Sequence, residues 1–312
     1  MKSVYKYFIL LILASCAMVT SCQEEYITYN DAEYVMFADT LATYAIQENE
    51  VKFNIPVVST VARNYDRTFA VEVIDVQGQA VEKLHFSLES NTVTIKAGQT
   101  RADVVGFGNY DNLDPAEPVY LTLQLIAPEA VQMPLYGNRT KAVLQKVCPF
   151  KPEDFSGWCV FSSMFLYQYS MTGSYQRLVN CKVKEGTEND VNPVIICRNL
   201  FKDGYDVEIA FHPEDPLNQY VTVPEGQAAA DEYSFFGISY GDNAILVRNS
   251  ALYTSSFFTY GRYLYVWTEL YVETLGELYG SVGHFYNVME FVSDAEARRL
   301  FNEGMPGYDD RL

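Results

Sequence analysis

The stretch YLYVWTELYV at residues 263–272 alternates between two kinds of side chain along its whole length. Because successive side chains of a β-strand point to opposite faces, this period of two predicts a strand with two unlike faces. The aliphatic set, which we expect to enter the core, is Leu264, Val266, Thr268, Leu270 and Val272. The other face would carry four aromatic rings and one carboxylate, namely Tyr263, Tyr265, Trp267, Glu269 and Tyr271. The opposite assignment, with the rings filling the inside of a barrel, also fits the alternation.

Short runs of the same alternating kind continue through residues 31–148, separated by Gly, Asn, Asp and Pro. The runs are residues 34–37, 51–55, 69–73, 92–95, 102–105, 119–125 and 142–144. Many short strands with turn residues between them are typical of a β-sandwich. Beyond them, Pro149 and Pro152 stiffen the chain and each removes a backbone donor, so we expect a domain boundary there.

Residues 149–312 are again rich in candidate strands and hold 30 aromatic side chains. The candidates are residues 158–166, 175–183, 194–197, 207–211, 220–223, 234–238, 244–248, 264–272 and 284–291. Such a succession favours an up-and-down barrel, which leaves no open sheet edge. Near the end, Ser293 and Glu296 have the spacing of a helix capping box, and Ala297 and Leu300 follow at helical spacing.

The chain is therefore predicted to be all-β. A β-sandwich domain would occupy residues 31–148, and an antiparallel β-barrel or calycin-like domain with a short C-terminal helix would occupy residues 149–312.

The N-terminus has the organisation of a secretory signal. Lys2 and Lys6 precede an apolar run at residues 8–13, which is too short for a bilayer span of about 20 residues. The residues before Cys22 resemble the bacterial lipobox, in which the Cys receives a diacylglycerol and becomes the first residue. This resemblance implies a signal peptide at residues 1–21 and a lipidated linker at residues 22–30. Cleavage before Cys16 and an ordinary leader without lipid are the alternatives.

Gln23-Glu24-Glu25 follows the predicted lipidation site and resembles the surface-export signal of Bacteroidetes lipoproteins. The resemblance implies an outer-membrane lipoprotein that is exposed at the cell surface, held to the membrane by its acyl chains. Retention in the inner leaflet is the alternative.

The charge balance excludes one class of partner. Removal of residues 1–21 takes away Lys2 and Lys6 and leaves 20 basic against 40 acidic residues. Such a chain repels phosphate backbones, so we expect no nucleic acid partner.

Cysteine and histidine patterns bear on disulfides and metals. Cys148, Cys159, Cys181 and Cys197 allow three pairings, and we expect either at least one disulfide or buried thiols. Cys181 and Cys197 lie on two runs that could form a hairpin. There is no CxxC motif and the chain has three histidines, so we expect no metal site and no cofactor.

Two family resemblances follow from the order of segments. The run from residue 85 to residue 123, with the acidic loop at Asp111, Asp114 and Glu117, resembles the Calx-β sandwich, which implies an Ig-like fold. Calx-β modules bind calcium through clustered loop carboxylates. Here the loop is sparse, and we expect it to be solvated. Residues 155–224 resemble the C-terminal lipocalin-like domains of Bacteroidetes surface lipoproteins, a family of unknown function.

Catalytic signatures are weak. Glu269 and Glu273 would lie on the same strand face about 13 Å apart at roughly 3.3 Å per residue. Glycosidase carboxylate pairs are about 5–9.5 Å apart. The sequence has no G-x-S-x-G motif, and we expect no enzymatic activity.

The aromatic row is the functional signal. Flat rings beside hydrogen-bond acceptors suit sugar faces, although cross-strand rings also stabilise sheets. We predict a surface-anchored binding or adhesion module, with a glycan as the ligand. The alternatives are a structural or assembly subunit of an outer-membrane complex and a hydrolase on the C-terminal domain.

Overall fold

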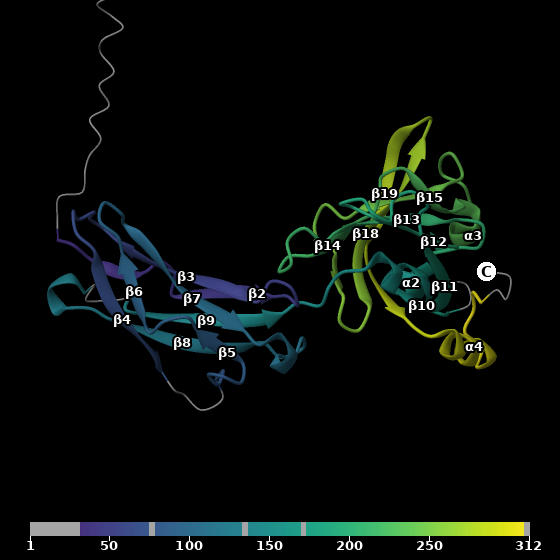
Figure 1. Cartoon of the computed structure of the whole chain (residues 1–312). Helices are drawn as coiled ribbons and strands as arrows, with labels where there is room; N and C mark the ends of the chain where they lie inside the picture. The colour runs from purple at the N-terminus through teal and green to yellow at the C-terminus, as the bar shows by residue number, and fades with distance from the viewer. Residues whose placement is uncertain (1–31, 75–78, 133–136, 170–172, 309–312) are drawn as a thin grey trace, which may run out of the picture.

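The computed structural model describes residues 32–74, 79–132, 137–169 and 173–308. They form two β-rich domains that follow one another along the chain (Figure 1). The predicted signal peptide at residues 1–21 and the whole predicted linker, with Cys22, lie outside the described residues. None of the helices within the described ranges has the length and apolar composition that a membrane crossing requires.

The N-terminal domain is a sandwich of two sheets. One sheet has the order β1 (Val35–Phe37), β3 (Lys52–Ser59), β7 (Arg101–Gly108) and β5 (Phe86–Leu88). The other has the order β2 (Leu41–Ile46), β9 (Arg139–Lys146), β8 (Val119–Ile126), β4 (Arg67–Ile74) and β6 (Thr92–Ile95). Phe53 and Ile55 from the first sheet and Leu121 and Leu123 from the second belong to one buried core. Alternation in these strands thus places one face of each sheet in the interior.

Two strands of this domain were not among the predicted runs. β2 pairs with β9 in parallel, from Leu41 opposite Lys141 to Ile46 opposite Lys146. β5 is only three residues long. β5 is too short for an alternation to be recognised, and β2 depends on a partner about 100 residues away, which a local pattern does not contain.

The C-terminal domain is one coiled sheet. Its main path runs through β14 (Tyr220–Thr222), β13 (Val207–His212), β12 (Val194–Arg198), β11 (Gln176–Val183), β10 (Gly157–Ser163), β19 (Glu277–Phe291), β18 (Tyr263–Thr274), β16 (Ile245–Asn249) and β15 (Gln227–Ala230). β17 (Ser256–Phe258) pairs with β18 off this path. The fold class predicted from the sequence is confirmed.

A side chain closes this sheet where backbone pairing stops. Oε1 of Gln227, at the start of β15, accepts a hydrogen bond from the Glu208 N–H of β13 at 2.6 Å. Nε2 of Gln227 donates to the Glu208 carbonyl at 3.0 Å. One amide side chain therefore makes the pair of hydrogen bonds that a neighbouring strand would make, and it joins β15, at one end of the sheet, to β13, the second strand from the other end.

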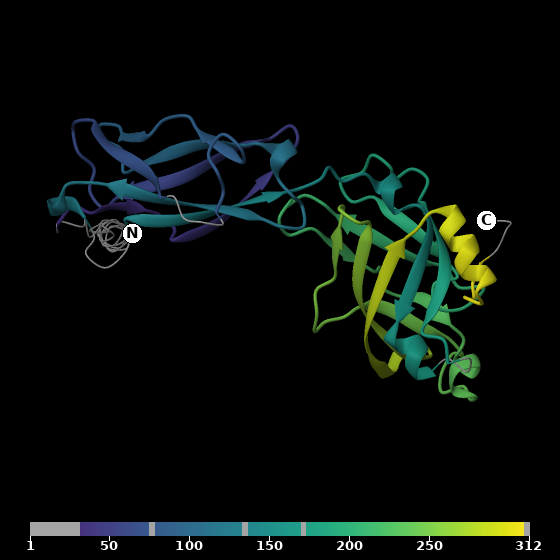
Figure 2. The same ribbon diagram turned by 90° about the horizontal axis from the view of Figure 1, so that it is seen from below.

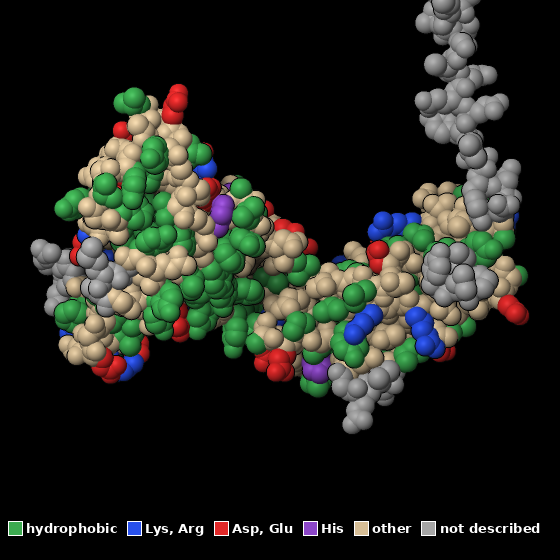
Figure 3. All heavy atoms as spheres, turned by 180° about the vertical axis from the view of Figure 1, so that it is seen from behind, with side chains coloured by type: hydrophobic (Ala, Val, Ile, Leu, Met, Phe, Trp, Pro, Cys, Tyr) green, Lys and Arg blue, Asp and Glu red, His purple; other side chains and the backbone are tan. Residues whose placement is uncertain are grey.

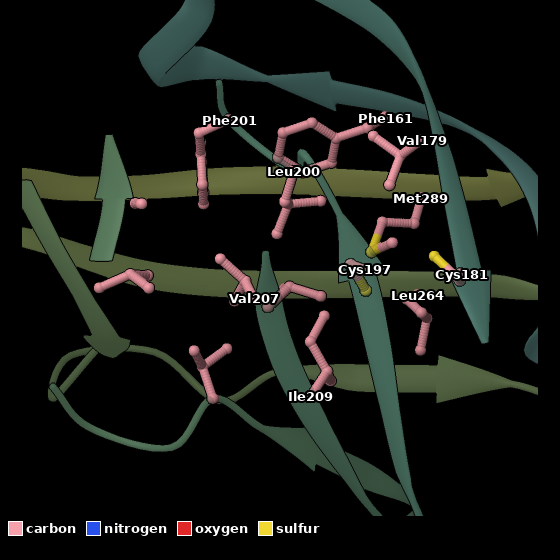
Figure 4. Packing of buried hydrophobic residues seen from close by; sticks show 14 of the residues in the cluster. Phe161, Val179, Cys181, Cys197, Leu200, Phe201, Val207, Ile209, Leu264 and Met289 are labelled. Atoms are coloured by element: carbon pink, nitrogen blue, oxygen red, sulfur yellow. The ribbon is translucent and has the colours of Figure 1, made fainter. Parts of the chain in front are cut away.

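The inside of the coiled sheet is filled with side chains. Phe161, Phe201, Leu200 and Met289 pack together there and are at most 2% exposed (Figure 4). Further Phe rings come from β13, β17 and β19. A carrier of the lipocalin type needs an open interior, whereas this interior is a packed core.

Short helices lie outside the strands: α2 (Met164–Tyr169), α3 (Glu232–Phe236) and α4 (Asp294–Asn302), with 3₁₀ turns η1 (Tyr110–Asn112), η2 (Glu129–Val131) and η3 (Pro152–Phe155). The predicted strand at residues 234–238 is wrong. Asp231 caps α3 by accepting from the Ser234 N–H at 2.8 Å, and Gly237 ends it in the left-handed conformation.

The predicted C-terminal helix is confirmed as α4. The Ser293 hydroxyl accepts from the Glu296 N–H at 3.2 Å, which is the expected cap. The helix lies beside β10 and β11 on the outside of the sheet (Figure 2). Ala297 of α4 packs there with Trp158, Val160 and Leu178 in a small second core.

Candidate functional site

Strand β18 has the two unlike faces that its alternation predicts. Leu264, Val266 and Leu270 are at most 2% exposed and belong to the core. Tyr263, Tyr265 and Trp267 alternate with them and are half-buried on the outside of the sheet. The rings do not fill the barrel, so the first of the two assignments holds for this part of the strand.

These three rings are part of a larger group, which we call the aromatic array. Its members are Tyr253, Phe258, Tyr263, Tyr265, Trp267 and Tyr286. Ring centroids are 4.1 Å apart for Tyr253 and Trp267 and 4.9 Å for Trp267 and Tyr286. Tyr265 lies 6.2 Å from Tyr286, at an interplanar angle of 6°. Every ring in the array therefore contacts at least one other ring, which holds it in a fixed orientation.

The backbone around Trp267 explains how Tyr253 joins the array. β16 pairs with β18 from Thr268 onward, and β17 pairs with it up to Tyr265. Between these strands the connection from β16 to β17 reaches Trp267, whose N–H donates to Ser255 Oγ at 2.9 Å. The Trp267 carbonyl accepts from the Ser250 N–H at 3.1 Å. This connection presents Tyr253 to the face of the indole.

A buried amide fixes the two strands that carry the array. Asn287 of β19 is 1% exposed, and its Nδ2 donates to the Val266 carbonyl at 2.9 Å and to Thr268 Oγ1 at 3.0 Å. At the other end, the Tyr263 hydroxyl donates to Glu290 at 2.8 Å. This hydrogen bond raises the pKa of Tyr263, which stays a neutral donor.

Glu269 and Tyr271 do not belong to the array, and their expected placement on an open face beside the other rings is wrong, because both are buried. Glu269 is 7% exposed and accepts a hydrogen bond from Arg248 Nε at 2.9 Å. Burial acts to raise the pKa of Glu269, but hydrogen bonds from Arg248 and Ser281 outweigh it and lower that pKa. Tyr271 is 1% exposed, with the Arg248 guanidinium 4.5 Å from its ring centroid. The register of β18 and β19 also shifts between Leu270 and Tyr271.

Three members of the array were missed in the sequence. Tyr253 and Phe258 lie on segments with no sustained alternation, so no local pattern predicted that their rings would lie on the same face as Tyr263, Tyr265 and Trp267. Tyr286 alternates with the buried Phe285 on β19, and that alternation was a usable signal.

A large cleft begins at the array. Its volume is about 1230 Å³, and its walls come from both domains. Phe258, Tyr263 and Tyr265 belong to both the array and the cleft wall. Of the described residues that line the cleft, only Asp215 carries a carboxylate, and hydrogen bonds from Asn218 and the Leu217 backbone lower its pKa. On the face shown in Figure 3, hydrophobic side chains gather over the C-terminal domain and extend toward the junction.

Of the two alternatives for the described cysteines, the structure shows thiols and no disulfide. All four are free, and Cys148 lies beside Tyr110 of the N-terminal domain, away from the barrel core. Cys159, Cys181 and Cys197 belong to that core. Cys181 of β11 lies directly opposite Cys197 of the neighbouring strand β12. Burial raises the pKa of Cys181 and of Cys197 well above the usual thiol value. These thiols are therefore apolar core residues in the structure.

Within the described ranges, no three His, Cys, Asp or Glu side chains are grouped as metal ligands. The acidic loop at Asp111 therefore holds no such group. The Asp114 carboxylate accepts a hydrogen bond from the Ala116 N–H at 2.8 Å, within the loop itself.

Comparison with protein families gives one match. A model described as a domain of unknown function, DUF4984, matches residues 135–303, which is more than half of the chain.

The chain belongs to the DUF4984 family.

The DUF4984 segment begins just before β9 and includes every strand of the barrel as well as α4. The whole aromatic array therefore lies within it. The cleft wall formed by Thr43, Pro115, Ala116 and Pro118 lies outside it. No curated protein matches the chain.

Several solved structures are similar in part. An apo Calx CBD1 domain is 15% identical, with a TM-score of 0.31, and the match covers 37% of this chain and 98% of that one. A putative carbohydrate binding protein from Bacteroides ovatus is 12% identical, with a TM-score of 0.30 and coverage of 81% and 74%. An auxiliary nutrient binding protein from Bacteroides thetaiotaomicron is 17% identical, with a TM-score of 0.29 and coverage of 86% and 93%. With TM-scores this low, none of these likenesses bears on function.

Proposed function

We propose that this DUF4984 protein is a non-enzymatic binding protein whose aromatic array holds a neutral glycan. The observation that carries the proposal is the group of six rings on the outside of the sheet, five of them on β17, β18 and β19 and Tyr253 on the connection before β17, in which each ring contacts at least one other. A sugar ring has an apolar face and a hydroxylated edge. Flat rings that are already oriented can cover the apolar face with little further loss of side-chain entropy.

Polar groups at the margin of the array suit the hydroxylated edge. Glu290 is an acceptor beside Tyr263, and Tyr265 and Tyr286 present phenol groups. Burial raises the pKa of Tyr286, so its hydroxyl is a neutral donor at ordinary pH. The chain carries a net charge of −18, which opposes binding of an acidic polysaccharide. A neutral glycan is therefore the class that fits.

We also propose that Cys22 carries a lipid anchor and that the protein faces outward from the outer membrane. The sequence pattern before Cys22 and the acidic residues after it support this proposal. Mass spectrometry of the native protein should find an acylated cysteine as the first residue. An unmodified thiol at position 22 or an intact leader would contradict it.

A second candidate function has one specific observation in its favour. The β18–β19 hairpin and the loop after α3 expose five large apolar side chains, each at least 50% exposed: Ile238, Tyr240, Leu275, Leu278 and Tyr279. Exposed apolar groups that gather at one place are typical of protein contact surfaces. This end of the domain suits a subunit of an assembly. Cross-linking in membranes should capture a partner, and Leu275→Asp should abolish that capture.

The glycan proposal is tested by binding measurements on a panel of neutral polysaccharides: starch, xylan, xyloglucan, galactomannan and yeast mannan. The wild type should bind at least one of them. Trp267→Ala should weaken that binding by about tenfold or more, as expected for a central aromatic contact. The matched control is Tyr233→Ala, because Tyr233 is a 66% exposed ring on α3 outside the array. Failure of the wild type to bind any polysaccharide, or equal binding by Trp267→Ala, would overturn the proposal.

A further inference from the structure

The cleft between the two domains is larger than a site for one small ligand. Its volume of about 1230 Å³ exceeds the roughly 300–1,000 Å³ of pockets that hold drug-sized molecules. It is also partly open to solvent and not enclosed. A cleft of this kind suits an extended ligand, whose ends can leave it.

The C-terminal wall of the cleft continues the aromatic array. Tyr263 and Tyr265 line the cleft, and Tyr265 is also 5.6 Å from Phe258 and 6.2 Å from Tyr286 in ring-centroid distance. Tyr260 and Tyr220 add further exposed rings to this wall. A chain that lies on Trp267 and Tyr286 can therefore pass over Tyr265 into the cleft without leaving an aromatic surface.

Tyr220 is held in place for such a contact. Its ring stacks on His212 with centroids 4.3 Å apart and an interplanar angle of 6°. His212 is in turn fixed through Nε2, which is 2.9 Å from Thr222 Oγ1, and through Nδ1, which is 2.9 Å from Asn192 Nδ2. Asp215, Asn218 and Gln219 precede Tyr220 on the same wall and supply hydrogen-bonding side chains.

The N-terminal wall has a different chemistry. It is formed by Thr43, Pro115, Ala116, Pro118 and the end of β9 with the residues after it. Gln145 holds this wall together, because its Nε2 donates to the Pro115 carbonyl at 3.0 Å and to the Lys146 carbonyl at 3.0 Å. The wall is therefore a fixed surface of small and cyclic side chains with a hydroxyl from Thr43, while the Lys146 ammonium lies 4.2 Å from the Tyr110 ring centroid.

A hydrogen bond also joins the two walls of the cleft. The Thr259 hydroxyl of the C-terminal wall donates to the Cys148 carbonyl, at the end of the N-terminal domain, at 3.2 Å. Thr259 and Cys148 both line the cleft. Two residues that line the cleft thus join its walls directly, and Pro149 and Pro152 limit the freedom of the segment between the domains.

From these contacts we propose that the interdomain cleft is a second glycan subsite, continuous with the aromatic array, and that the N-terminal sandwich supplies one of its walls. The inference rests on the proposed glycan function and deepens it. The ligand is a neutral oligosaccharide or polysaccharide chain longer than the array alone can cover. The sandwich is then part of the binding site and not only a spacer between the barrel and the membrane.

The test narrows the cleft from its N-terminal wall without touching the array. Ala116 is exposed and lines the cleft, and the contact that it makes to Asp114 is through its backbone N–H, so Ala116→Trp adds a ring in the cleft and preserves that bond. Ala62→Trp is the matched control, because Ala62 is an exposed alanine of the same domain that does not line the cleft.

The measurement is calorimetric binding of an oligosaccharide series, from two sugar units upward, prepared from whichever panel polysaccharide the wild type binds. In the wild type, affinity should rise with chain length beyond the span of the array. Ala116→Trp should weaken binding of the longest members by about tenfold or more and leave the shortest unchanged. Ala62→Trp should behave as the wild type at every length.

The outcomes separate the two proposals. Wild-type affinity of Ala116→Trp for the longest chains, with binding still lost in Trp267→Ala, would overturn the cleft subsite and leave the array function standing. Loss in Ala116→Trp with no effect of Trp267→Ala would overturn the array as the primary site and support the cleft. If the wild type binds no panel polysaccharide, both proposals fail.

Discussion

The two ends of one face of β18 have opposite environments. Tyr263, Tyr265 and Trp267 are half-buried with their rings toward solvent, whereas Tyr271, further along the same alternating set, is 1% exposed. The difference comes from what lies above the strand. Over Tyr271 there is the Arg248 guanidinium, which also pairs with Glu225 at 2.9 Å. The comparison teaches that alternation decides which face a side chain takes, while neighbouring segments decide whether that face is open.

The same comparison separates stability from binding. Rings at the open end are available to a ligand, whereas the Tyr271 ring at the covered end contacts Arg248 and the Gly226 backbone just before β15. Both tryptophans of the chain, Trp158 and Trp267, lie in the C-terminal domain, so tryptophan fluorescence reports the unfolding of this domain alone. Four substitutions or conditions test the comparison, from the largest expected effect to the smallest.

Tyr271→Ala should cost about 3 kcal/mol in the free energy of unfolding, because removal of a fully buried ring leaves a cavity. Urea unfolding followed by tryptophan fluorescence measures the change. Tyr271→Phe keeps the ring and should cost only about 1 kcal/mol for the lost hydroxyl contact. A cost below 1 kcal/mol for Tyr271→Ala would show that the two ends of the strand do not differ.

Glu269→Gln should destabilise the C-terminal domain by about 2 kcal/mol, since it leaves the Arg248 charge without its buried partner. The value lies below the range for a fully buried pair because the Arg248 side chain is 29% exposed. Glu273→Gln is the matched control, since Glu273 lies on the same strand and outside this ion pair. Equal stability of the two variants would contradict the covered-end interpretation.

Low pH should reduce the contribution that Glu269, at the covered end of β18, makes to the free energy of unfolding. The pKa of Glu269 is lowered in the folded protein relative to its ordinary value of 4.5. Its contribution is therefore fully present above about pH 4.5 and is lost as the pH falls through the lower folded value. The difference in unfolding free energy between the wild type and Glu269→Gln should shrink below pH 4.5. A difference that stays constant down to pH 2 would mean that the Glu269 pKa is not depressed.

Trp267→Ala should cost only about 1 kcal/mol in stability, the value of a half-exposed ring with its cross-strand contacts. Thermal unfolding monitored by the fluorescence of the remaining Trp158 measures it. The same variant should lose glycan binding, so its effect on affinity should be the larger one. A stability loss near that of Tyr271→Ala would instead assign the ring a role in the fold.

How much the sequence revealed differs between the parts of the candidate site. The alternation of residues 263–272 placed Tyr263, Tyr265 and Trp267 on the outer face and Leu264, Val266 and Leu270 in the core, because side-chain direction in a strand is a local property. It also placed Tyr271 outside, where a register shift and Arg248 cover it. Tyr253 and Phe258 join the array through chain segments that only the folded sheet brings beside β18.

The sequence by itself determined what depends on near neighbours along the chain, namely the all-β class, most of the strands, and α4. The Ser293 hydroxyl that caps α4 accepts a hydrogen bond from an N–H only three residues further on. Only the tertiary structure decided the parallel β2–β9 pairing, the Gln227 closure of the barrel, the meeting of three cysteines in the core and the interdomain cleft. Each of these joins groups that are far apart in the sequence. Their contact energies depend on the packing of the whole domain, and no local pattern of residue types contains them.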